Sequence, residues 1–297
     1  MSILAIQDLH KTYGARPAVQ GVNMKIGSGQ IYGFLGPNGA GKTTTIRMLL
    51  GLIRPSRGNI QLFEQHLNRR ALTKVGAIVE APSAYGHLTG KENLQVVARL
   101  RGMSERRIPE LLDYVGLKDA QNRVVRGYSL GMKGRLSIAA ALMGSPEFLV
   151  LDEPTNGLDP NGIREVRELI QSLPQRGITV MVSSHILSEV EQMATHVGII
   201  HQGMMRYEGA LKDLQNRSKP TLRIRVSDPE VAFSKLQMSY PQAQLSEKTI
   251  ELPADPEKAP GIIRELVQQN FDVYSITPHQ ATLEDLFMNI TSKERAQ

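Results

Sequence analysis

The sequence has 297 residues, of which 41% are apolar, and a formal net charge of +6. This length allows one large domain or two smaller ones, and the apolar content is ordinary for a globular protein. Because the sequence contains no cysteine, disulfides, thiol nucleophiles and zinc–thiolate sites are excluded.

The positive charge is unevenly distributed. Residues 218–297 carry 9 Lys or Arg and 11 Asp or Glu, whereas residues 1–217 carry 26 and 18. A basic surface can attract nucleic acid or an anionic membrane. However, the sequence has no compact block of Lys and Arg with interleaved aromatic residues. We therefore interpret the charges as solvated and expect no nucleic-acid partner.

Neither a signal peptide nor a membrane span is expected. The apolar stretch in the N-terminal segment "MSILAIQDLHK" is too short for a signal peptide. No apolar run approaches the roughly 20 residues that a membrane-spanning helix needs. We expect a cytoplasmic chain that reaches the inner face of the cell membrane only through a partner.

The first 215 residues alternate short apolar strands with helical stretches, as in an α/β domain. The strands expected are Leu4–Leu9, Gln30–Leu35, a short one near Asn59–Phe63, Gly76–Val79, Phe148–Leu151, Thr179–Ser183 and Val197–His201. Helices are expected at Lys42–Gly51 and Asn161–Leu173. The span Gly90–Gly127 is expected to be wholly helical and to belong to a helical subdomain at about residues 90–145, apart from the sheet.

This pattern breaks near "QNRSKP", residues 215–220. The elements expected after it are a strand at Thr221–Val226, a helix at Glu230–Met238, an apolar pair flanking Lys248, a helix at Ala259–Gln269, a strand at Phe271–Thr277 and a helix at Leu283–Ile290. We predict two domains, residues 1–217 and 218–297. The second has about 80 residues, within the usual range for a domain, and is of the α+β class.

A glycine-rich stretch, "GFLGPNGAGKTTT" at residues 33–45, predicts a phosphate-binding loop. Gly36, Gly41, Lys42 and Thr43 fit G-x-x-x-x-G-K-[ST], and the motif lies between an expected strand and an expected helix, as it requires. Backbone N–H groups at the start of the helix suit an anion. The alternative is a chance glycine turn.

The residues expected to hold ATP in this loop are Gly36, Pro37, Asn38, Gly39, Ala40, Gly41, Lys42, Thr43 and Thr44. Lys42 is expected to reach the β- and γ-phosphates, and the Thr43 hydroxyl to ligate Mg²⁺. The cofactors expected are therefore ATP and Mg²⁺.

A second motif, "EFLVLDEPTNGLDP" at residues 147–160, places an acidic pair after a buried strand. In α/β sheets ligands bind at the carboxyl ends of the strands, where this strand delivers Asp152 and Glu153. We expect Asp152 to hold Mg²⁺ and Glu153 to act as general base toward the attacking water.

Two further side chains are candidates for the same site. His185 ends "MVSSH" and follows a strand expected to run parallel to the one before Asp152, so it is expected to touch the γ-phosphate and the water. A structural histidine is the alternative. Tyr13 in "HKTYG" is expected to stack on adenine, and the alternative is an exposed tyrosine in a turn.

In this order, the motifs "HKTYG", the glycine loop, "YSLGM" (128–132), "LVLDEP" (149–154), "NGLDP" (156–160) and "SSH" (183–185) resemble the ATP-binding cassette of ABC transporters. The resemblance covers residues 1 to about 215. It implies that Ser129 and Gly131 bind the γ-phosphate of ATP held by a second subunit, and it adds Asp159 to the nucleotide-binding residues. An ordinary serine cap is the alternative interpretation of "YSLGM".

The sequence departs from the family pattern at two places. "YSLGM" resembles LSGGQ but has Tyr128, Leu130 and Met132 in three of its five positions. The glutamine that the family places near the metal falls on Glu80, which we include among the metal-site residues. An ionised Glu only accepts hydrogen bonds, whereas Gln also donates, so we expect Glu80 to alter coupling more than binding.

The resemblance extends to the bacterial branch that serves multidrug and antimicrobial-peptide export or lantibiotic immunity. It implies an ATPase that dimerises with a second copy or a sister subunit and drives a separate ABC-2-type permease. Two alternatives stay open, a soluble ABC ATPase acting on ribosomes or DNA and a permease-bound regulator with weak ATPase activity.

Overall fold

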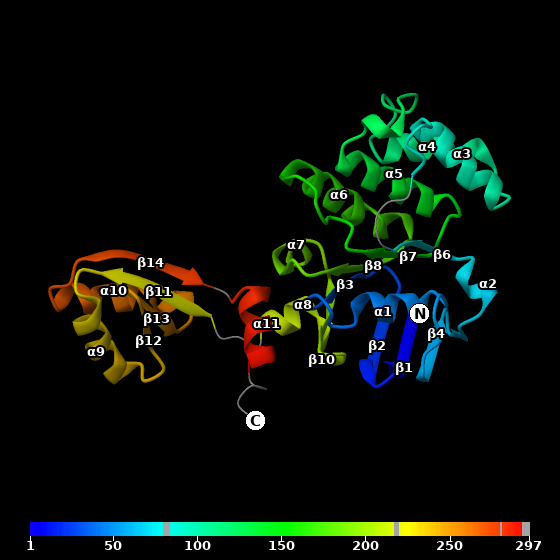
Figure 1. Cartoon of the computed structure of the whole chain (residues 1–297). Coiled ribbons are helices and arrows are strands. Elements are labelled where there is room, and N and C mark those ends of the chain that lie inside the picture. Colours follow the sequence, from blue (N-terminus) through cyan, green and yellow to red (C-terminus); the bar gives the residue numbers. More distant parts are fainter. Residues whose placement is uncertain (80–83, 217–219, 280, 293–297) are drawn as a thin grey trace. The chain divides into compact units, whose positions relative to one another are not determined.

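The chain divides into two units, Met1–Leu211 and Lys212–Gln297. The computed structural model describes residues 1–79, 84–216, 220–279 and 281–292. The first unit contains two sheets with a helix between them and a group of helices on the far side of the larger sheet (Figure 1).

The larger sheet has six strands in the order β10-β9-β3-β8-β7-β6. These strands are β3 (Ile31–Leu35), β6 (Val75–Ile78), β7 (Phe148–Asp152), β8 (Thr179–Ser184), β9 (His196–His201) and β10 (Met204–Ala210). All neighbours pair in parallel except β10, which runs antiparallel to β9 at one edge. Every residue of β3, β7 and β8 is buried, which explains why these strands form continuous apolar runs in the sequence.

The smaller sheet is antiparallel, with strand order β2-β1-β4-β5. Its strands are β1 (Ser2–Tyr13), β2 (Arg16–Gly27), β4 (Arg57–Leu62) and β5 (Gln65–His66). The strand expected near Asn59–Phe63 is therefore β4, and β2 had not been expected. Helix α1 (Lys42–Leu49) packs Ile46, Met48 and Leu49 into a core shared by both sheets.

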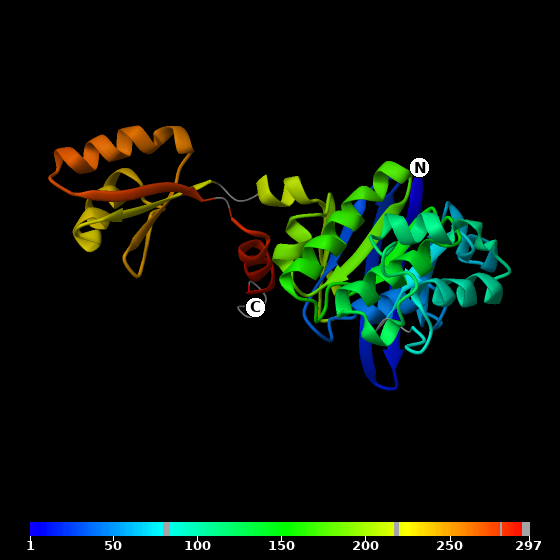
Figure 2. The same cartoon turned by 90° about the horizontal axis from the view of Figure 1, so that it is seen from above.

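Helices cover the face of the larger sheet opposite α1 (Figures 1 and 2). The elements on this side are α3 (Gly90–Leu100), α4 (Ile108–Tyr114), α5 (Leu130–Leu142) and α6 (Pro160–Ser172), with short 3-10 turns at Glu105–Arg107, Val125–Gly127 and Pro174–Arg176. The Gly90–Gly127 span, which was expected to be wholly helical, therefore consists of helices joined by turns. The first unit also contains the short helices α2 (Arg69–Leu72) and α7 (Leu187–Glu191), and α8 (Leu211–Asn216) begins at its last residue and continues into the second unit.

The second unit is built around an antiparallel sheet of order β12-β13-β11-β14. Its elements are β11 (Thr221–Val226), α9 (Pro229–Ser239), β12 (Gln244–Ser246), β13 (Thr249–Pro253), a 3-10 turn (Pro256–Lys258), α10 (Ala259–Gln268), β14 (Val273–His279) and α11 (Leu283–Ser292). The β-α-β-β-α-β order with this strand arrangement is the ferredoxin-like, split β-α-β topology. The apolar pair around Lys248 forms the β12–β13 hairpin.

The core of the second unit is apolar. Leu222 and Ile224 of β11 and Ile250 and Leu252 of β13 are fully buried, and α9 and α10 add Leu236, Ile262 and Leu266. Alternate residues of the strands, such as Arg223 and Glu251, face outward and pair with each other. No helix in the described part of the chain has the length and apolar character that a membrane span requires.

Candidate nucleotide site

The glycine loop between β3 and α1 follows a path that only glycine allows at two positions. A Cβ on Gly36 would lie 2.3 Å from the carbonyl oxygen of Ile200, and one on Gly41 would lie 2.7 Å from that of Ala18. Gly41 also has a φ of +107°, in the left-handed region. Pro37, Asn38, Gly39 and Ala40 form the turn between these two close approaches.

Lys42, the first residue of α1, is turned back onto this loop. Its side chain is 6% exposed, and its Nζ donates to the carbonyl oxygens of Gly36 at 2.6 Å and Pro37 at 3.3 Å. The same Nζ lies 3.3 Å from Oε1 of Glu153. A buried ammonium is therefore held at the mouth of the loop with one carboxylate as its counter-ion.

Thr43 and Asp152 lie side by side at the carboxyl end of the sheet. The Thr43 hydroxyl donates to Oδ2 of Asp152 at 2.9 Å, and the Ser183 hydroxyl donates to Oδ1 at 2.5 Å. Asp152 is 6% exposed. Both carboxylate oxygens are thus fixed by hydroxyls from α1 and β8. Thr44 follows on the first turn of α1 and is half-buried.

These oxygen donors fit a magnesium ion. Mg²⁺ is usually held by one or two protein oxygen ligands together with substrate phosphates rather than by an all-protein cage. Thr43 and Asp152 supply such a pair beside the phosphate loop. Within the described ranges no group of three or more His, Cys, Asp or Glu side chains is arranged to hold a metal alone.

Glu153 occupies a strained position between Lys42 and His185. Its φ is +51°, a left-handed conformation that is costly for a residue with a side chain and is often found at functional sites. Its backbone N–H donates to the hydroxyl and carbonyl oxygens of Ser183 at 3.1 and 3.2 Å. Its Oε2 lies 2.6 Å from Nδ1 of His185, which follows β8. Of the three residues expected to be catalytic, Glu153 therefore contacts both Lys42 and His185.

A pocket of about 370 Å³ opens beside this cluster. Its lining includes Thr43, Asp152 and Glu153 together with Leu130, Gly134 and Leu158. The signature segment, residues 128–132, thus begins α5 at the edge of the pocket. Leu130 is 56% exposed, so this large side chain faces outward at a position where the family has glycine.

The signature segment is anchored by its first residue. The Tyr128 ring is buried, its hydroxyl donates to the carbonyl oxygen of Ala120 at 2.7 Å, and burial raises its pKa. Ser129 is the N-cap of α5, since its hydroxyl oxygen accepts from the N–H of Met132 at 3.2 Å. Gly131 sits where α5 approaches α6, because an added Cβ would lie 3.3 Å from Cα of Gly162.

Two predicted site residues have local roles in the structure, and one is not described. Asp159 is the N-cap of α6 and accepts from the N–H of Gly162 at 3.3 Å. Tyr13 ends β1, is 50% exposed, and has the Lys11 ammonium 5.1 Å from its ring centroid. Glu80 lies outside the described residues.

Sequence reasoning missed a second set of contacts at this site. Ser183 had been quoted within "SSH" without a role, yet it binds both Asp152 and the Glu153 backbone. The Thr155 hydroxyl donates to Oε2 of Glu189, and both side chains are buried. This pair joins the segment after Glu153 to the helix after His185. The sequence around Glu189, in the short helix α7, gave no indication that this side chain is buried.

Comparison with known proteins shows which family has this arrangement of residues. The ABC transporter family matches residues 19–156. The bacitracin transport ATP-binding protein BcrA of Bacillus licheniformis is 42% identical over 297 residues, covering 97% of both chains. The lantibiotic transport ATP-binding protein SrtF of Streptococcus pyogenes is 46% identical, covering 72% of this chain and 96% of its own.

A solved ATP-binding subunit of an ABC transporter has a TM-score of 0.64 with 31% identity, covering 72% of this chain and 92% of that one. The family and the α/β fold predicted from the motifs are thereby confirmed. The ATP-binding domains of ABC transporters hydrolyse ATP, so the predicted ATPase activity is confirmed as well. The chain belongs to the family of ABC transporter ATP-binding proteins.

Proposed function

We propose that this chain is the ATPase subunit of a bacterial exporter of peptide antibiotics or similar compounds. The observation that carries the proposal is the similarity to a bacitracin transport ATP-binding protein across 97% of both chains, which includes the second unit. The transport function in the names of these relatives favours this role over action on ribosomes or DNA.

Hydrolysis is assigned to the cluster around Glu153. Lys42 donates to the β- and γ-phosphates when its ammonium leaves the loop carbonyls that it now contacts. Thr43 and Asp152 would hold Mg²⁺, which when bound would stabilise the charge that develops on the phosphates. Glu153 takes the proton of the attacking water, and His185, 2.6 Å from its carboxylate, orients that carboxylate and the γ-phosphate. Tyr13 stacks on adenine.

A second copy, or a sister subunit, completes each site. Ser129 and Gly131 start α5, so their N–H groups and the positive end of the helix suit the partner's γ-phosphate. Asp159 caps α6 by binding Gly162, the residue that Gly131 approaches, and belongs to the same contact surface. The exposed side chain of Leu130 leaves less room for the phosphate than glycine would, so we expect weaker contacts with the phosphate.

The membrane partner is an ABC-2-type permease, through which the chain sits on the inner face of the cell membrane. Glu80 links the metal site to that permease, and the segment from residue 218 regulates the ATPase or assists dimerisation. A small ferredoxin-like unit that follows the nucleotide residues suits such an accessory role.

Isolation from membranes tests this function. The tagged chain, purified from detergent-solubilised membranes of its own host, should carry with it a protein with about six hydrophobic spans. Cells with Glu153→Gln should tolerate less bacitracin or lantibiotic than parental cells, to the level of a deletion strain. Glu251→Gln, in the outward-facing pair of the second unit, is the control and should keep tolerance. Co-purification with ribosomes alone, together with unchanged tolerance of Glu153→Gln cells, would contradict the proposal.

A further inference from the structure

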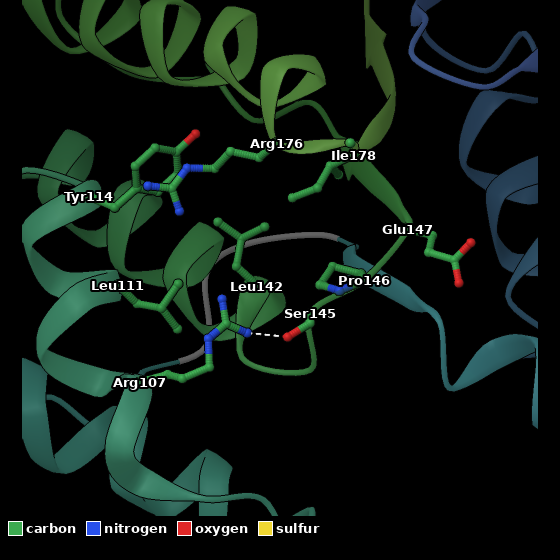
Figure 3. Close-up of a pocket in the computed structure, with 10 residues that line it drawn as sticks. Arg107, Leu111, Tyr114, Leu142, Ser145, Pro146, Glu147, Arg176 and Ile178 are labelled. Carbon is green, nitrogen blue, oxygen red and sulfur yellow. Dashed lines mark hydrogen bonds between the residues drawn. The ribbon is translucent and has the colours of Figure 1, made fainter.

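A second pocket lies at the opposite end of the same strands, where β7 and β8 begin. Its volume is about 300 Å³, and its lining comes from the Glu105–Arg107 turn, α4, the end of α5, the Ser145–Glu147 segment and the turn before β8 (Figure 3). Pro146 lies two residues before β7, and Ile178 immediately precedes β8. The nucleotide residues lie at the other ends of these strands, so this pocket is separate from the site described above.

Two guanidinium groups enter this pocket. The Arg176 guanidinium lies 3.8 Å from the centroid of the Tyr114 ring, which is a stacking distance. The Arg107 guanidinium donates to the Ser145 hydroxyl (Figure 3). Ser145 has a φ of +49°, a conformation rarely adopted by residues with a side chain, so its backbone is strained where its hydroxyl meets Arg107.

These two cations share one carboxylate. Glu110 lies 3.2 Å from Nη1 of Arg176 and 3.8 Å from Nε of Arg107. Glu147 also lines the pocket, but it pairs with Lys74 at 2.7 Å, and its carboxylate points away from both arginines (Figure 3). The charges in and around the pocket therefore leave an excess of about one positive charge.

Apolar side chains form the remaining wall. Leu111 of α4, Leu142 of α5 and Ile178 line the pocket together with Pro146 (Figure 3). Small-molecule sites combine an apolar lining with a few polar groups that fix orientation, and a volume of about 300 Å³ is at the lower end of their range. This wall suits a small ring or short hydrocarbon rather than a fully polar ion.

From this combination we infer that the pocket binds a small organic monoanion, an apolar or aromatic body that carries one carboxylate. The planar guanidinium matches a carboxylate through two parallel hydrogen bonds. A single excess positive charge favours a carboxylate over a phosphate monoester, which carries about −1.5 to −2 at pH 7. The inference rests on this pocket alone and does not depend on the compound transported.

A fluorescence titration with 2-naphthoate tests the inference. Because the chain contains no tryptophan, the probe can be excited with little background from the protein. The full chain is saturated with MgADP, so that the phosphate loop is not available to the anion. We expect saturable binding of 2-naphthoate, and at least tenfold weaker binding of its neutral analogue 2-naphthalenemethanol and of acetate.

Three arginine variants locate the bound probe. Arg176→Gln and Arg107→Gln should each weaken binding of 2-naphthoate about tenfold or more. Arg164→Gln, on an exposed arginine of α6 that pairs with Glu168, is the matched control and should leave binding unchanged. If Arg176→Gln fails to fold, Arg107→Gln still decides, since Ser145 and Glu110, which pair with Arg107, are both exposed. The inference is overturned by an absence of saturable binding below about 10 mM, by parental affinity in the folded arginine variants, or by equal affinity for the neutral analogue.

Discussion

The two units of the chain differ in what they bury. Every buried polar or charged side chain in the described ranges belongs to the first unit, and these include Lys42, Asp152, Ser183 and Glu189. In the second unit the described core is apolar, and charges such as Arg223 and Glu251 lie on the outer face of the sheet. Burying polar groups costs free energy unless they are paired, and the buried Lys42, Asp152, Ser183 and Glu189 of the first unit are each paired. The difference agrees with the assignment of ATP binding and hydrolysis to the first unit.

The largest effect is expected at the general base. Glu153→Gln removes the carboxylate that contacts both Lys42 and His185 but keeps its size, so ATP turnover should fall about 10²- to 10⁴-fold. MgATP affinity should stay close to the parental value. Turnover and nucleotide affinity of the purified chain are measured in parallel with Glu251→Gln, which lies in the second unit. Parental turnover in Glu153→Gln would place the chemistry elsewhere.

The next largest effect is expected on nucleotide binding. Lys42→Ala removes a buried cation and its charged hydrogen bonds to the phosphates, which are worth about 1.5–3 kcal/mol each. The Kd for MgATP should therefore rise at least tenfold, as measured by equilibrium dialysis. Lys248→Ala, at the hairpin of the second unit, provides the comparison and should bind MgATP with the parental Kd. An unchanged Kd for Lys42→Ala would show that Lys42 does not contribute to binding the phosphates.

A core substitution in the second unit should affect stability alone. Leu252→Ala removes a fully buried side chain and should lower the free energy of unfolding of that unit by about 2–5 kcal/mol. MgATP affinity should not change, because every predicted nucleotide residue precedes residue 212. Denaturant unfolding and nucleotide binding are compared in the same samples. A parallel loss of MgATP affinity in the folded variant would show that the two units are energetically coupled.

The buried contact between Thr155 and Glu189 should have a smaller effect on catalysis. Glu189→Gln keeps the shape but replaces a charged acceptor, so turnover should fall roughly tenfold while MgATP affinity is retained. Thr155→Val should have a similar effect, and the double variant should lose little more than either single one. A melting temperature lowered without any change in turnover would limit the pair to a structural role.

The smallest effect is expected at the start of α11 in the second unit. The hydroxyl and N–H of Thr282 donate to Asp285, and the hydrogen bond from the Thr282 side chain is the main cause that holds the pKa of Asp285 below its ordinary value. A depressed folded-state pKa means that this stabilisation is present above the unfolded pKa, near 4, and is lost as pH falls. Thr282→Ala should cost about 1 kcal/mol at pH 7 and less at pH 3. Equal costs at both pH values would argue against a role for the Asp285 charge.

The same contrast explains how much the sequence could predict. The strands β3, β7 and β8 are continuous apolar runs because both faces are covered, and the residues that follow β3 and β7 form recognisable motifs. Strand β2 was missed because only a third of its residues are buried and bulges interrupt its register with β1. The Thr155–Glu189 contact joins residues 34 positions apart and leaves no local pattern. Motifs reveal groups that bind the substrate, whereas the groups that support them depend on the fold.

The claim that two subunits close on ATP has one direct measurement. Glu153→Gln with MgATP should elute as a dimer in size-exclusion chromatography and as a monomer without nucleotide. Adding Ser129→Arg to this variant should leave MgATP affinity intact but abolish the dimer, because Ser129 is assigned to the partner's nucleotide. A dimer of undiminished stability in the double variant, or a Glu153→Gln chain that stays monomeric when saturated with MgATP, would contradict the composite site.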